Sequence, residues 1–202
     1  MFKKTIVFLI AISALLFSNI ANAADIKPYL GLNIGVGVPT STKDGKDRLG
    51  QKYNSNGSTS LYVGLKVNNN YRTEIAYLDN YNDSNDFFGL YSDELELQGA
   101  MWNNYYDFKN STNFTPYVGF GIGAAKLNNK INILGIKVGD DSATVSVYQP
   151  KAGIAYDINE HHSINLGYSF ITTSTAKLNL GGDDVNKKYQ ANNYEIGYRY
   201  TF

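Results

Sequence analysis

Apolar and polar side chains alternate one by one along most of this chain, and a period of two residues is typical of β-strands. At the C-terminus, one face carries Tyr194, Ile196, Tyr198, Tyr200 and Phe202, and the residues between them are polar or small. The pattern recurs in eight segments, at residues 29–38, 60–67, 71–77, 94–101, 117–124, 151–156, 163–170 and 193–202. Beyond residue 23, no extended segment has the 3.6-residue period of an amphipathic helix. The pattern therefore predicts an all-β protein of eight strands.

The connections between these segments alternate in length. Short connections fall at residues 68–70, 109–113 and 157–162, and long polar ones at residues 39–58, 79–92, 126–143 and 175–190. Short turns at one end and long loops at the other are typical of an up-and-down barrel in a bacterial outer membrane. We therefore predict an eight-stranded antiparallel transmembrane β-barrel with long extracellular loops and short periplasmic turns. An even number of strands puts both termini on the periplasmic side.

The first 23 residues are typical of a cleaved secretory signal. Lys3 and Lys4 precede an apolar run at residues 5–17, and Ala21-Asn22-Ala23 offers signal peptidase a small-x-small site. The apolar run is shorter than the roughly 20 residues of a membrane-spanning helix. We expect residues 1–23 to be removed. Residues 24–202 would then form one barrel domain in contact with outer-membrane lipid.

Tyrosines lie near the ends of several predicted strands. Examples are Tyr71, Tyr77, Tyr105, Tyr148 and Tyr156. Outward rings at both ends of a barrel form the girdles that mark the two membrane interfaces. A soluble β-core would not explain why the rings collect at strand ends. The tyrosines therefore favour a membrane barrel.

Charged side chains collect on the inward faces of the predicted strands. They are four bases and four acids: Lys66, Arg72, Glu74, Glu94, Glu96, Lys151, Glu195 and Arg199. The interior of an eight-stranded barrel is just wide enough for side chains to fill it. Because unpaired buried charges are costly, we predict an ion-pair network that closes the lumen. The alternative is a narrow ion path between these charges.

The composition excludes several kinds of chemistry. The chain has no cysteine, which excludes disulfides, thiolate catalysis and Cys-ligated metals. Its 18 basic and 18 acidic residues give no broad positive field, so nucleic acid is not an expected partner. The two histidines, His161 and His162, precede Ser163, and such residues could serve a lipid-modifying barrel enzyme. The predicted topology puts them at a periplasmic turn, away from the outer leaflet. We expect no catalytic residue, cofactor or metal.

Three segments, at residues 27–35, 115–125 and 152–161 with the following Ser163, resemble the strands of small eight-stranded surface barrels of the OmpA-like and opacity-protein class. That class includes surface antigens of rickettsia-like bacteria. The resemblance covers nearly all predicted strands and none of the long loops. The last strand is similar to the assembly signal of such barrels, which implies that Phe202, Tyr200 and Tyr198 are recognised by the barrel-insertion machinery of the periplasm.

The long loops are the expected functional surface, because exposed loops on a rigid scaffold are where binding usually occurs. We therefore expect a surface adhesin or antigen, or an envelope-structural role, with a small ion-conducting pore and a lipid-modifying enzyme as alternatives. Phe87 and Phe88 are candidate contacts for host-surface molecules. The apolar alternation at Ile131, Ile133, Ile136 and Val138 indicates either a contact patch or a β-extension above the membrane.

Overall fold

The computed structural model of the chain describes residues 26–40, 56–85, 91–134, 136–180 and 183–202. The predicted signal segment, residues 1–23, lies outside the described residues, as do Phe87 and Phe88. The described strands are β1 (Lys27–Pro39), β2 (Asn56–Lys66), β3 (Tyr71–Asn85), β4 (Tyr91–Asp107), β5 (Phe114–Ile133), β6 (Ile136–Asp157), β7 (His162–Thr173), β8 (Ala176–Leu180), β9 (Asp183–Lys187) and β10 (Gln190–Thr201). Within the described residues, no helix has the length and apolar character needed to cross a membrane.

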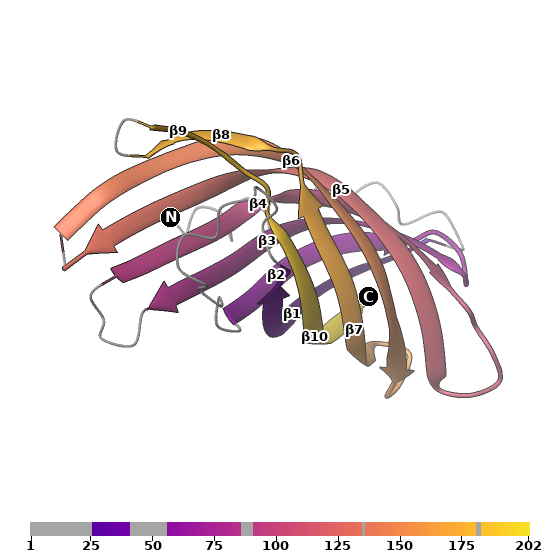
Figure 1. Cartoon of the computed structure of the whole chain (residues 1–202). Coiled ribbons are helices and arrows are strands. Elements are labelled where there is room, and N and C mark those ends of the chain that lie inside the picture. The colour runs from indigo at the N-terminus through magenta and orange to yellow at the C-terminus, as the bar shows by residue number, and fades with distance from the viewer. Residues whose placement is uncertain (1–25, 41–55, 86–90, 135, 181–182) are drawn as a thin grey trace.

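Eight of these strands close into a single antiparallel barrel, in the order β1-β10-β7-β6-β5-β4-β3-β2 (Figure 1). The first and last barrel strands close the sheet by pairing from Tyr29 opposite Thr201 to Pro39 opposite Ala191. From β1 to β7, each strand pairs with the next one in the chain, and β7 then pairs with β10. The two strands between them in the chain, β8 and β9, form a separate hairpin. The predicted eight-stranded up-and-down barrel is confirmed.

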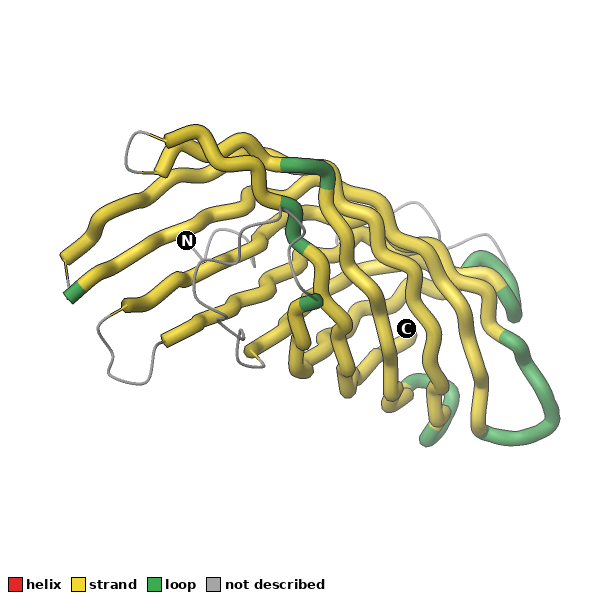
Figure 2. The backbone as a smooth tube through the Cα atoms, in the orientation of Figure 1, coloured by secondary structure: helices red, strands yellow, loops and turns green. Residues whose placement is uncertain are grey.

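The central strands continue far beyond the others at the end opposite the short turns (Figure 2). The predicted loop at residues 126–143 is mostly strand, because β5 and β6 stay paired from Phe114 opposite Tyr156 as far as Ile133 opposite Ile136. Likewise, β3 and β4 occupy much of the predicted loop at residues 79–92. Of the two interpretations of the apolar alternation at residues 131–138, the structure shows the β-extension. The β8–β9 hairpin, in the predicted loop at 175–190, lies beside β6.

Next to the short turns, the barrel has an apolar outside and a polar inside, and we call this region the membrane part. The outward residues of β5 are apolar from Phe114 to Ala124. At about 3.4 Å per residue and a tilt near 40°, this run covers roughly the 25 Å height of an outer-membrane band. The buried inward side chains at this level include Asn33, Ser60, Arg72, Glu74, Asn103, Asp107, Ser163 and Arg199.

Farther from the turns, the two faces exchange their character, and we call this region the protruding part. Its buried inward side chains are mainly apolar and include Leu78, Leu95, Leu97, Leu127, Val145, Val147, Ile171 and Leu178. The outward residues of β5 are now Lys126, Asn128 and Lys130. Tyr189 follows β9 and packs into this core, where its hydroxyl accepts a hydrogen bond from Asn82 at 2.8 Å. Burial raises the pKa of Tyr189 to about 12. The protruding part is thus built like a water-soluble β-protein.

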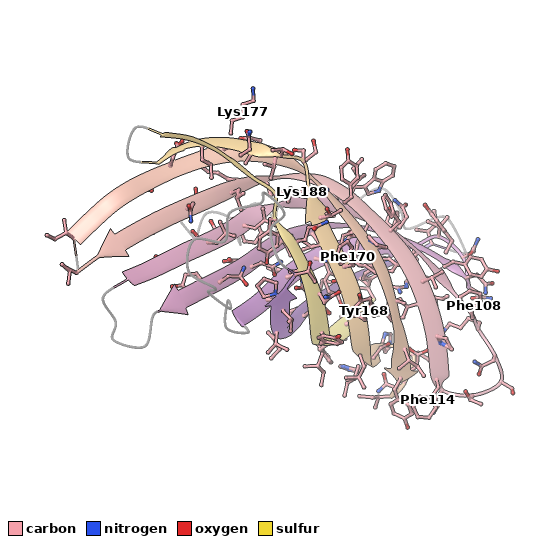
Figure 3. All side chains as sticks on the ribbon, in the orientation of Figure 1. Phe108, Phe114, Tyr168, Phe170, Lys177 and Lys188 are labelled. Carbon is pink, nitrogen blue, oxygen red and sulfur yellow. The ribbon has the colours of Figure 1, made fainter. Side chains whose placement is uncertain are left out.

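Outward aromatic rings lie at two levels of the membrane part. Phe108 and Phe114 lie at the turn end, whereas Tyr168 and Phe170 lie farther along the wall (Figure 3). The predicted girdle residue Tyr105 is not among the outward rings: it is buried in the lumen, and its neighbour Tyr106 is exposed. The prediction for Tyr105 was wrong because β4 was assigned the opposite alternation.

Candidate functional site

The lumen holds a buried ion pair between two adjacent strands, close to their short turns. Arg72 of β3 places Nε 2.7 Å from Asp107 Oδ2 and Nη2 2.9 Å from Asp107 Oδ1, and β4 supplies this carboxylate. Both side chains are almost fully buried, with exposed fractions of 5% and 3%. The guanidinium also lies 4.4 Å from the centroid of the Tyr105 ring. The bidentate ion pair and the contact with the aromatic ring together compensate the desolvation cost of burying the arginine.

Glu74 is a further buried charge, and it accepts hydrogen bonds from three neutral donors. Its Oε2 accepts a hydrogen bond from Tyr29 Oη at 3.0 Å. Its Oε1 accepts one from Tyr105 Oη at 2.8 Å and one from Asn103 Nδ2 at 3.0 Å. The three donors thus bind both oxygens of the Glu74 side chain.

Another cluster closes the turn end of the lumen around Asp157. Its carboxylate lies 2.7 Å from Lys109 Nζ and 3.6 Å from Arg199 Nη2. Ser163 donates to the same carboxylate at 2.7 Å and lies 3.3 Å from Arg199 Nη2. The Asp157 carboxylate is therefore the shared partner of two basic side chains and one hydroxyl group.

Four tyrosine rings fill the remaining space, and glycines on neighbouring strands make room for them. The buried inward rings are Tyr29, Tyr62, Tyr105 and Tyr117. A Cβ added at Gly31 would overlap the Tyr62 ring, and one at Gly64 would overlap the Tyr29 ring. The small residues of the alternating pattern therefore have a packing role. The cavity left between these side chains, lined by Arg72 and Glu74 among others, measures about 20 Å³. That volume has room for about one water molecule.

Six of the eight predicted lumen charges do face inward: Lys66, Arg72, Glu74, Lys151, Glu195 and Arg199. Several of them contact neutral side chains and not charges of opposite sign. Glu195 accepts a hydrogen bond from Ser58 at 2.9 Å, and Lys151 Nζ lies 5.9 Å from the Tyr105 ring centroid. Among the described residues, Lys66 has no hydrogen bond or ion pair.

The other two predicted lumen charges, Glu94 and Glu96, lie on the outer face of β4. Their neighbours Leu95 and Leu97 are the buried ones. Glu96 accepts a hydrogen bond from Asn128 at 3.2 Å, and Glu94 lies 3.8 Å from Lys130. The prediction was wrong because it took the two leucines to face lipid. At this height the strand has entered the protruding part, where apolar side chains face inward.

Sequence reasoning missed three members of the lumen network: Asp107, Lys109 and Asp157. Asp107 lies beyond the predicted strand at residues 94–101, and Lys109 and Asp157 begin the predicted turns at residues 109–113 and 157–162, so none of them was assigned to the lumen. Asp107 continues the inward alternation of Tyr105, so the strand pattern alone could have identified it. Lys109 lies in the turn, and no strand period applies to it.

The His161-His162-Ser163 segment does not form a shared site. His162 lies on the outer side, where Nδ1 contacts the Tyr198 hydroxyl, whereas Ser163 faces the lumen. His161 Nδ1 lies 2.8 Å from the backbone oxygen of Thr201. Among the described residues, no group of three or more His, Asp or Glu side chains is placed to hold a metal.

The predicted assembly residues Tyr198, Tyr200 and Phe202 lie along the outer face at the end of β10. The centroids of the last two rings are 5.0 Å apart, and the Tyr200 ring stacks on His161 at 5.9 Å. The C-terminus thus ends in a continuous aromatic strip at the turn end of the barrel.

Comparison with known proteins agrees with this architecture. Residues 7–202 match the protein family described as "Outer membrane protein beta-barrel domain". The chain belongs to that family. This barrel therefore lies in the bacterial outer membrane, with its short turns on the periplasmic side and its protruding part outside the cell.

The relatives include surface proteins. The chain is 32% identical over 122 residues to the outer membrane protein PagN of Salmonella typhimurium, and this match covers 54% of the chain and 51% of PagN. It thus spans about half the length of that relative. A Rickettsia bellii protein described as a candidate adhesin is 25% identical over 228 residues, which cover 98% of this chain and 99% of the relative.

Solved structures show the same fold at low sequence identity. Neisserial surface protein A superposes with a TM-score of 0.61 at 15% identity, covering 87% of this chain and 97% of that one. Ail, the attachment invasion locus protein of Yersinia pestis, superposes with a TM-score of 0.52 at 13% identity, covering 88% and 98%.

The Arg72–Asp107 pair should be a main support of the membrane part. Asp107→Asn leaves a buried guanidinium without its counter-charge and should lower the free energy of unfolding by about 3–5 kcal/mol. The exposed turn residue Glu160 gives the matched control, because Glu160→Gln should change this energy by less than about 0.5 kcal/mol. Urea unfolding in detergent, followed by the fluorescence of the single tryptophan Trp102, measures both. Equal midpoints for Asp107→Asn and the intact barrel would show that the pair contributes nothing.

Proposed function

We propose that the protein is an adhesin, which uses the barrel as an anchor and the protruding part as the contact surface for host-surface molecules. The observation that carries this proposal is the length of the central strands. A membrane crossing needs about 9–11 residues per strand, whereas β5 has 20 residues and β6 has 22. The extra length builds a separate apolar core and a polar outer surface in water.

The similarity to named attachment proteins supports this proposal. The Rickettsia bellii relative matches nearly end to end, and Ail shares the fold. The outer face of the protruding part carries charged and amide groups, such as Glu96, Lys126 and Lys130. These groups suit a polar, wet interface rather than lipid.

We further propose that the protein is neither an enzyme nor a pore. His162 and Ser163 point to opposite sides of the wall, so they do not form a nucleophile and base pair. The Arg72 and Asp157 clusters occupy the lumen, and the cavity beside Arg72 and Glu74 has room for about one water molecule, which is less than a hydrated ion needs. Both observations favour a scaffold whose action is binding.

The adhesin proposal is tested by shortening one hairpin. Asn128 and Ser142 are paired across β5 and β6, so residues 129–141 can be replaced by an Asn-Gly turn without changing the barrel register. Bacteria that display the intact protein should bind cultured animal cells more than vector controls do, and the shortened variant should lose most of that gain. Counting bound bacteria at equal surface display measures both.

A control variant, Ser111→Ala with Thr112→Ala, changes the periplasmic turn and should bind like the intact protein. If the intact protein binds no better than the vector, or the shortened variant binds equally well, the protruding hairpin is not the contact surface.

We also propose that Phe202, Tyr200 and Tyr198 are contacted by the insertion machinery after export by the predicted signal at residues 1–23. These rings lie outward on the last strand, where a folding barrel can still present them. The same strip also suits the periplasmic girdle, so the two roles need to be separated.

A comparison of two aromatic residues at the same membrane level separates these roles. Phe202→Asp should lower the amount of protein in the outer membrane several-fold and increase degraded periplasmic material. Phe114→Asp removes an equally exposed girdle ring from β5 and should have a smaller effect. Quantitative immunoblots of membrane fractions measure the difference. Equal losses for the two variants would mean that Phe202 is a girdle residue only.

A further inference from the structure

A pocket of about 380 Å³ opens at the periplasmic end of the lumen, and Asp157, Ser163 and Arg199 of the network described above form part of its lining. The chain enters and leaves the barrel here, so β1, β2, β7, β10 and two periplasmic turns all contribute to its wall. The volume lies in the usual range for small-ligand sites. Its lining is mainly polar and charged, with the bases Lys27, Lys66 and Arg199 and the acids Asp157 and Glu160.

The wall formed by β1 and β2 has two cations in direct opposition. Lys27 and Lys66 are cross-strand partners, and Lys66 is in turn the partner of Arg72 on β3. Directly opposed like charges destabilise a sheet. Arg72 is neutralised by Asp107, but among the described residues neither lysine has a hydrogen bond or an ion pair.

Among the described residues, the acids of the pocket make no hydrogen bond or ion pair with these lysines. Asp157 is occupied by Lys109 and Ser163, each at 2.7 Å, and has Arg199 at 3.6 Å. Glu160 lies exposed in the turn between β6 and β7. The two lysines lie in register without a bound acid, so an external anion could bind to both.

We propose that this pocket binds the carboxylate of a short peptide in the periplasm, with the carboxylate held between Lys27 and Lys66. A carboxylate accepts hydrogen bonds from two ammonium groups at once. Other lining residues are Glu160, whose carboxylate suits the N–H groups of a peptide and repels a dense anion such as phosphate, and Asn113 and Asn159, whose side-chain NH2 groups suit peptide carbonyl oxygens. The pocket lies at the opposite end of the barrel from the protruding part, so it does not depend on the adhesin proposal.

The test uses the mature protein in detergent micelles and titrates it with acetyl-Gly-Glu-Ala carrying a free carboxylate. Backbone NMR signals of Lys66, Ser163 and Thr201 should shift saturably. Lys66→Gln and Lys27→Gln should each weaken binding about tenfold or more, because each removes a charge-assisted hydrogen bond. Lys177→Gln, at an exposed lysine of β8 outside the cell, is the matched control and should bind like the intact protein.

Two further arms identify the ligand chemistry. The uncharged analogue acetyl-Gly-Gln-Ala-amide should not bind, and inorganic phosphate should bind more weakly than the acidic peptide. Without peptide, Lys66→Gln should unfold at the same temperature as the intact protein or higher, since it removes repulsion. No saturable shift in the intact protein, equal binding of phosphate, or a lower unfolding temperature of Lys66→Gln would each overturn the proposal.

Discussion

The structure depends on the closure of one sheet by backbone hydrogen bonds between β1 and β10. In lipid, every backbone N–H and C=O group needs a partner within the protein, and only a closed barrel of strands or a helix provides this. Closure leaves each strand two faces, one toward the lumen and one toward the surroundings. Successive side chains of a strand point to opposite faces, so every second residue faces the lumen. Whether the outer face meets lipid or water then decides which kind of side chain each face carries.

The surroundings change along the barrel, and the side chains change with them. In the membrane part, lipid requires an apolar outside, so the polar and charged groups face inward and bind one another around Arg72, Glu74 and Asp157. In the protruding part, water requires a polar outside, and Leu97 and Leu127 fill the interior instead. Strands such as β5 pass through both regions without a change of alternation. One continuous sheet thus joins the membrane part to the protruding part.

The sequence predicted the barrel well because lipid-facing alternation is a strong local signal. On β10 it gave the correct faces for Glu195, Arg199 and the terminal rings. The same reasoning failed for Glu94 and Glu96, since an apolar face indicates lipid in one part of β4 and a core in the other. Trp102 and Tyr106 mark the outward positions of β4 and share their alternation with Glu94. The partners of Asp107 and Asp157 depend on cross-strand register and turn geometry, which no local pattern contains.

The exchange of faces between the two parts is tested most directly by site-directed spin labelling, since the chain has no native cysteine. Single cysteines would replace Val118, Ile122, Lys126 and Lys130 on the outer face of β5, in protein reconstituted in lipid bilayers. We expect labels at Val118 and Ile122 to collide mainly with oxygen dissolved in lipid, and labels at Lys126 and Lys130 to collide mainly with a water-soluble nickel reagent. Lipid-like collision rates at Lys126 and Lys130 would contradict the account, because β5 would then remain in the membrane above Ala124.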